Sequence, residues 1–153
     1  MAFRKIGVVG AGTMGNGIAQ AFAQAGLEVV MTDVAQAALD RAMNTISGSY
    51  DRLIKKEKMT AEQKAAALGR IKTATELAAL KDADLVIEAA TENLDLKLKI
   101  FRQLDELAKA DAVIASNTSS ISITKLAAST KRADKVIGMH FFNPVPLMAL
   151  VEL

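Results

Sequence analysis

The sequence predicts an α/β protein with a doubly wound, mostly parallel β-sheet, and three observations support that fold class. Short apolar, β-branched runs alternate with segments of helical periodicity. The first run, KIGVVG at residues 5–10, suits a buried parallel strand. It opens a strand-helix-strand unit of about 30 residues, the usual size. We expect residues 1–153 to form one domain with its own core.

The first unit is predicted in order from its N-terminus. Residues 5–10 form the first strand, and residues 13–25 form a helix that Gly26 is placed to end. Residues 28–33, EVVMTD, form the second strand.

A helical hairpin is predicted next, inserted between the second strand and a third strand near residues 70–73. Apolar residues recur at spacings of three and four along one face of its first helix, namely Leu39, Met43, Ile46, Tyr50 and Leu53. The sequence TAEQ at residues 60–63 has the form of a capping box, so the second helix should begin at Thr60.

The rest of the chain continues the alternation. Helices are predicted at residues 92–107 and near Ile123. The predicted strands are residues 85–90, 112–116 and 135–142, with one more beginning at residue 149. Ligands of such sheets bind beyond the carboxyl ends of the strands, so polar residues at those ends are the candidate site.

Composition excludes several classes of function. The formal charge of +2 and the few aromatic residues argue against a nucleic-acid partner. The chain has no cysteine and one histidine, so a thiolate site or a multi-histidine metal site is not expected. No apolar run could cross a bilayer, and the N-terminus enters a strand at once, so we expect no membrane partner and a cytoplasmic location.

The glycine-rich loop GAGTMG predicts a dinucleotide cofactor. Its residues Gly10, Gly12, Thr13, Met14 and Gly15 follow a strand and open a helix, as phosphate binding by backbone N–H groups requires. Asp33 ends the next strand, where a carboxylate can accept hydrogen bonds from ribose hydroxyls and repel a 2′-phosphate. We therefore expect NAD. The alternative is an ordinary glycine turn with an unrelated aspartate.

His140 is the candidate for proton transfer. Imidazole titrates near neutral pH, and His140 is placed near the carboxyl end of its predicted strand. Glu152, on the following strand, is expected to lie beside it and to orient the ring. Taken alone, one histidine on a strand is more often structural. The run SNTSS at residues 116–120 offers donors to a ligand, or is simply a turn before a helix.

Four segments together resemble one family. They are GAGTMG, EAATEN at residues 88–93, SNTSS, and HFFNPVPLMALVEL at residues 140–153. The chain resembles, over essentially its whole length, the NAD-binding domain of L-3-hydroxyacyl-CoA dehydrogenases, particularly the bacterial 3-hydroxybutyryl-CoA enzymes. The resemblance implies a Rossmann-type domain and NAD-dependent oxidation of (S)-3-hydroxyacyl-CoA to 3-oxoacyl-CoA, or the reverse reduction.

The resemblance also implies roles for particular residues. His140 would be the general base or acid and Glu152 its partner, while Ser119 would bind the substrate near the nicotinamide. The other implied cofactor contacts are Glu92, Lys97 and Asn143. Without the resemblance, Glu92 and Lys97 would be ordinary charges near a helix start.

The hairpin would contact the coenzyme A tail through Ser49 and Lys56. A lysine can neutralise a phosphate as a point charge. The segment RLIKKEK at residues 52–58 is otherwise typical of a solvated helix end. A dehydrogenase of the same fold that acts on a sugar acid is an alternative, and these two residues argue against it.

The family has a second, helical domain that follows the strand at which this sequence stops. That domain supplies an active-site asparagine and most of a homodimer interface, and both are absent from residues 1–153. The isolated chain is therefore expected to be an incomplete enzyme. As a binding module, it would hold NAD with little turnover.

Overall fold

The computed structural model describes residues 2–153 and has a six-stranded parallel sheet at its centre. The strand order is β3-β2-β1-β4-β5-β6, and every neighbouring pair is parallel. The strands are β1 (Lys5–Val9), β2 (Glu28–Thr32), β3 (Ile71–Ala74), β4 (Leu85–Glu88), β5 (Val113–Ser116) and β6 (Val136–Gly138). The chain winds outward from β1 to β3 and then returns to β4 beside β1. This reversal creates a crevice at the carboxyl ends of β1 and β4.

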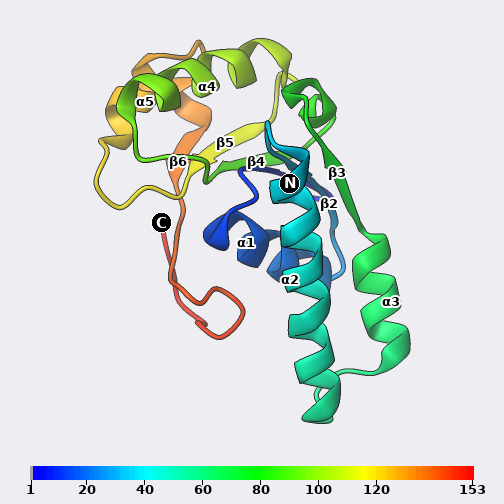
Figure 1. Ribbon diagram of the computed structural model, residues 1–153. Helices are drawn as coiled ribbons and strands as arrows, with labels where there is room; N and C mark the ends of the chain where they lie inside the picture. The colour runs from blue at the N-terminus through cyan, green and yellow to red at the C-terminus, as the bar shows by residue number, and fades with distance from the viewer. Residues whose placement is uncertain (1) are drawn as a thin grey trace.

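Helices cover both faces of this sheet (Figure 1). One face carries α1 (Thr13–Gln24) and α2 (Gln36–Lys55), and the other carries α4 (Leu94–Leu107) and α5 (Ile123–Ala128). Two apolar cores result, one on each side of the sheet. The shorter elements are α3 (Ala61–Gly69) and the 3₁₀ turns η1 (Leu77–Leu80) and η2 (Ala133–Lys135). The doubly wound architecture predicted from the sequence is confirmed.

The predicted helical hairpin is present. Its helices α2 and α3 pack together and form the connection along the chain from β2 to β3. Thr60 caps α3 as expected. Its hydroxyl accepts from the Gln63 N–H, and the Gln63 side chain accepts from the Thr60 N–H. Gly26 follows α1 with a φ of 97°, a conformation that suits glycine at a helix end.

The single strand predicted at residues 135–142 is wrong, because the structure divides it in two. Gly138 pairs with Ser116, the last residue of β5, so the parallel partner runs out there. The chain then leaves the main sheet, and β7 (His140–Phe141) pairs antiparallel with β8 (Val151–Glu152). We call this pair, with its connecting loop, the C-terminal ribbon. Its segment after β6 descends past α1 in Figure 1. Within residues 2–153, no helix is long and apolar enough to cross a membrane.

Candidate functional site

The glycine loop lies in the crevice and is shaped by close backbone approaches. Gly10 has a φ of 103°, and a Cβ there would lie 2.7 Å from the Ala89 carbonyl oxygen. A Cβ on Gly15 would lie 1.8 Å from the Gly10 carbonyl oxygen, so helix and turn meet at a distance that only glycine allows. Gly12 differs, because a Cβ there would meet nothing within 4 Å. The loop is thus tight at its two ends and open in the middle.

The open middle of the loop, at Gly12, forms the N-terminal end of α1. Gly12 is the N-cap, no side chain caps the helix, and its first turn carries no acidic residue. Uncapped N–H groups and the positive end of the helix dipole favour an anion at this point. A cavity of about 280 Å³ lies here, lined on one side by Gly12, Thr13 and Met14. A pyrophosphate fits this environment in charge and in space.

Asp33 lies at the end of β2, next to the glycine loop. One carboxylate oxygen accepts from the Ala11 N–H at 3.0 Å, and the other accepts from the Ala35 N–H at 3.0 Å. The half-buried carboxylate therefore fastens the glycine loop to the second strand. Each oxygen keeps a lone pair, so these bonds leave room for the predicted contact with ribose.

A second hollow, of about 450 Å³, extends from Asp33 toward α4. Its apolar walls come from Val34, Leu77, Leu96 and Ile100, a lining that suits a flat apolar ring. Sequence analysis did not find these residues, because they come from separate elements and form no motif. It also did not find Lys99, which α4 brings to this hollow, because the residues directly after Asp33 (Val34, Ala35 and Gln36) include no cation.

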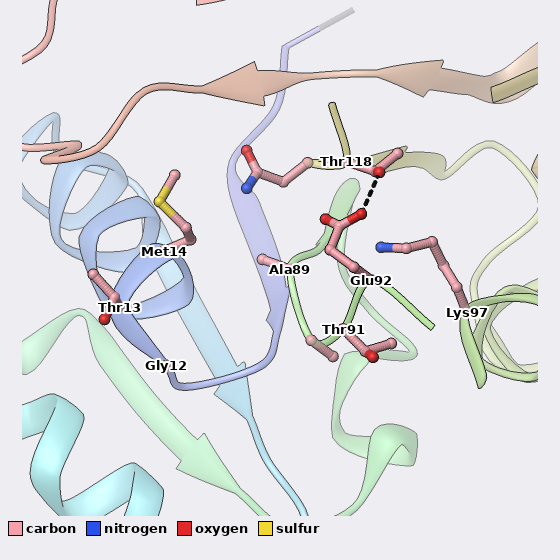
Figure 2. A pocket seen from close by; sticks show the side chains of 10 residues that line it. Gly12, Thr13, Met14, Ala89, Thr91, Glu92, Lys97 and Thr118 are labelled. Atoms are coloured by element: carbon pink, nitrogen blue, oxygen red, sulfur yellow. Dashed lines mark hydrogen bonds between the residues drawn. The ribbon is translucent and has the colours of Figure 1, made fainter. Parts of the chain in front are cut away.

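Glu92 lies on the opposite side of the first cavity from Met14 (Figure 2). It follows β4, just before α4, and its Oε2 accepts from the hydroxyls of Thr118 at 2.7 Å and Ser120 at 3.1 Å. The two polar motifs EAATEN and SNTSS are thereby joined along one wall. The other oxygen, Oε1, remains available to a ligand.

Lys97 lies beneath that wall, in the first turns of α4, with a side chain 1% exposed. Its ammonium group pairs with Glu88, which is fully buried at the end of β4. The hydroxyl of Ser116 donates to the same Glu88 oxygen at 3.0 Å, and the other oxygen accepts from the Ala90 N–H at 2.8 Å. Lys97 was expected at the cofactor and does line the cavity. No role was predicted for Glu88, although an acidic residue at the carboxyl end of an apolar strand is a signal that could have indicated one.

His140 and Glu152 face each other across the C-terminal ribbon, as the sequence predicted. They are register partners in the β7–β8 pair, and Nδ1 of His140 lies 4.0 Å from Oε2 of Glu152. The histidine side chain is 28% exposed and the glutamate side chain 71% exposed. The Phe142 ring packs against the imidazole at a centroid distance of 4.6 Å. The arrangement is an accessible imidazole with a carboxylate behind one nitrogen.

Ser119 and Asn143 are both exposed, and each lies on a loop. Ser119 belongs to the loop after β5, and Asn143 follows β7. The side chain of Asn117 joins these two regions, because its Oδ1 accepts from the Phe141 N–H at 2.8 Å. Asn117 lies within the SNTSS motif, but no pattern in the sequence indicated a separate role for it.

The hairpin residues Ser49 and Lys56 are placed differently from each other. The Ser49 hydroxyl accepts from the Gln20 side chain at 2.7 Å, so it lies against α1. The Tyr50 hydroxyl donates to the Gln20 carbonyl, and burial raises the pKa of Tyr50 to about 12. Lys56 is exposed at the C-terminal end of α2, about two helical turns from Ser49. Among residues 2–153, no group of three or more histidines or acids could hold a metal ion.

Comparison with known proteins gives consistent matches to this chain. Residues 5–153 match the family model described as 3-hydroxyacyl-CoA dehydrogenase, NAD binding domain. The chain is 53% identical over 150 residues to a 3-hydroxybutyryl-CoA dehydrogenase of Bradyrhizobium diazoefficiens, covering 98% of this chain and 51% of that protein. It is 48% identical over 149 residues to the Clostridioides difficile protein of the same name, covering 97% of this chain and 53% of that protein.

The fold also matches a solved structure. The crystal structure of an (S)-3-hydroxybutyryl-CoA dehydrogenase from Ralstonia eutropha aligns with a TM-score of 0.96 and 63% identity. The alignment covers 98% of this chain and 53% of that one. The chain thus spans about half the length of the curated relatives it matches.

Proposed function

This chain belongs to the family of NAD-binding domains of 3-hydroxyacyl-CoA dehydrogenases, and on that premise we propose that its protein oxidises (S)-3-hydroxyacyl-CoA to 3-oxoacyl-CoA, or catalyses the reverse reduction. The substrate we propose first is 3-hydroxybutyryl-CoA, which the relatives' names contain. NAD is the cofactor. The observation that carries the proposal is the accessible His140–Glu152 pair, connected through Phe141 and Asn117 to the loop that walls the cofactor cavity.

The residues of the crevice fit NAD. The open position at Gly12 and the uncapped start of α1 suit the pyrophosphate, and Asp33 suits the ribose hydroxyls. We propose that Glu92, Lys97 and Asn143 contact the nicotinamide half. When bound, NAD accepts or returns the hydride of the reaction.

We propose that His140 moves the proton. Its Nδ1 faces Glu152, which leaves Nε2 as the nitrogen that accepts the substrate hydroxyl proton while hydride leaves C3. The carboxylate of Glu152 then stabilises the imidazolium that forms. In the reduction His140 returns the proton to the carbonyl oxygen. Ser119 donates a hydrogen bond to the same oxygen in this proposal.

For the coenzyme A tail we propose contacts at Ser49 and Lys56. Lys56 is exposed, so its ammonium group can bind a phosphate without first giving up a buried contact. Lys56→Ala should raise the Michaelis constant for acyl-CoA about fivefold, equivalent to ~1 kcal/mol, and leave NADH affinity unchanged. An unchanged constant would count against this contact.

The proposal extends to the assembly. We propose that residues 1–153 are one NAD-binding domain, and that a helical domain beyond residue 153 supplies an asparagine to the active site and forms a homodimer. The half-length match to the relatives supports this arrangement. The cytoplasm is the proposed location.

The test is NADH oxidation with acetoacetyl-CoA by the full-length protein. His140→Gln should lower kcat by a factor of about 10² to 10⁴, the usual contribution of general acid–base catalysis, while NADH still binds. Absence of turnover in the wild-type protein would exclude the activity. Full activity in His140→Gln would exclude the role of His140.

A further inference from the structure

The segment that follows His140 packs against helix α1. The Phe141 ring meets the Phe22 ring of α1 edge-on, with centroids 6.2 Å apart. Val145, four residues later, is 6% exposed and belongs to the same core as α1. The loop that carries Asn143 is therefore held at both ends against one helix.

Gly17 of α1 leaves the space that Val145 fills. A Cβ on Gly17 would lie 2.9 Å from the Val145 Cβ and 3.2 Å from its Cγ2, closer than the roughly 3.5–4.0 Å of good carbon contacts. Glycine inside a helix is unfavourable compared with alanine, so the helix alone does not explain Gly17. Gly69 of α3 provides a contrast, since a Cβ there would meet nothing within 4 Å.

The same helix begins at the cofactor loop. Gly12 caps α1 beside the pyrophosphate position, and Gly17 lies about 7.5 Å further along the axis. The place where the cofactor phosphates bind and the place where the His140 segment rests are thus two points on one rigid element. Because one helix carries both points, the distance between them is fixed.

We propose that Gly17 is a positioning residue of the dehydrogenase reaction, which acts through Val145 to set the distance of His140 from the cofactor. This inference rests on the proposed function. A misplacement of about 1 Å in a catalytic group can cost about 100-fold in rate, so one added methyl group at this contact is enough to matter.

The test compares Gly17→Ala with the matched control Gly69→Ala in the full-length protein. Gly17→Ala should lower kcat for acetoacetyl-CoA reduction at least tenfold and change the NADH dissociation constant less than about twofold. Cofactor-free crystals of Gly17→Ala should show residues 143–146 displaced from α1 by about 1 Å. Gly69→Ala should match wild type in all three measurements.

Two further variants keep the test decisive. Val145→Gly in the Gly17→Ala background removes the Val145 Cβ, the atom closest to the added methyl group, together with both Val145 methyl groups, and should restore most of the lost kcat. Val145→Ile enlarges the other partner of the contact by one methylene group. It should lower kcat several-fold without changing NADH affinity, and it replaces Gly17→Ala as the test if that variant does not fold. Unchanged kcat, an undisplaced loop, or a parallel loss of NADH affinity that Val145→Gly does not reverse would overturn the proposal. An inactive wild-type protein would instead exclude the proposed function, and the crystals would still show whether Val145 moves.

Discussion

The two walls of the site are built by opposite means. The wall that lines the cofactor cavity joins the carboxyl ends of β4 and β5 through Glu88, Lys97 and Ser116, whose side chains are almost completely buried and are bonded to one another. The C-terminal ribbon presents His140 and Glu152 at the surface, 4.0 Å apart. One wall is fixed by buried charge, and the other is fixed by the apolar contacts behind it.

This difference has a physical basis. A buried ion pair contributes little net stability compared with apolar residues, but separating its partners leaves an uncompensated buried charge and is costly. Such a group suits a wall that must hold two loops in register before a cofactor binds. In the proposed function His140 needs access to its substrate, so its position has to be set by neighbours that are themselves buried, such as Phe141 and Val145.

Removal of one partner of the buried pair should have the largest effect. Glu88→Ala leaves the Lys97 ammonium buried without its carboxylate, and we expect a loss of ~3–5 kcal/mol in the free energy of unfolding. Urea denaturation of the full-length protein measures it. The double variant Glu88→Met/Lys97→Met should recover most of this loss, because no unpaired charge remains. A loss below about 1 kcal/mol in Glu88→Ala would show that the pair does not hold the wall.

The ribbon should respond to loss of an apolar group instead. Phe141→Ala removes a ring that is 7% exposed and packed on Phe22, and should cost ~3 kcal/mol in unfolding free energy. Phe142→Ala, at the adjacent and half-buried phenylalanine, should cost less than half as much. Equal costs at the two positions would contradict the view that the ribbon is held from behind.

Asn117 links the loop after β5 to the C-terminal ribbon, and its substitution should have an intermediate effect on the free energy of unfolding. Asn117→Ala leaves the partly buried Phe141 N–H without an acceptor, at a cost of ~1–2 kcal/mol. The kcat for acetoacetyl-CoA reduction should fall as well, because the start of β7 loses its tie to the cofactor wall. Asn117→Asp keeps an acceptor oxygen and should restore most of the stability. If aspartate restores nothing, the hydrogen bond is not the link.

Sequence analysis predicted the parts of this protein that depend on local patterns. Strand and helix positions followed from periodicity, and the capping box at Thr60 was confirmed. The split of residues 135–142 was not predictable, because it depends on β5 ending at Ser116, a property of a different segment. Local pattern cannot report where a neighbouring strand stops.

The candidate site shows the same division. The motifs identified the glycine loop, Glu92 and the His140–Glu152 pair, and the structure confirms that the last two face each other. Glu88 was missed because its role appears only when α4 brings Lys97 back over the end of β4. Gly17 was missed because its partner, Val145, is distant in the sequence. Residues whose importance lies in a contact between distant segments need the fold to be recognised.

Glu152 should give the smallest change in stability and so defines the other extreme of the comparison. Its carboxylate is 71% exposed and lies 4.0 Å from the imidazole, so Glu152→Gln should change the unfolding free energy by less than about 0.5 kcal/mol. The same substitution should lower kcat by about 10-fold or more, because the amide cannot stabilise the imidazolium. Glu106→Gln, at another exposed glutamate, serves as the control and should change neither quantity. A stability loss above 1 kcal/mol would mean that charge also holds the ribbon together, and an unchanged kcat would remove Glu152 from the mechanism.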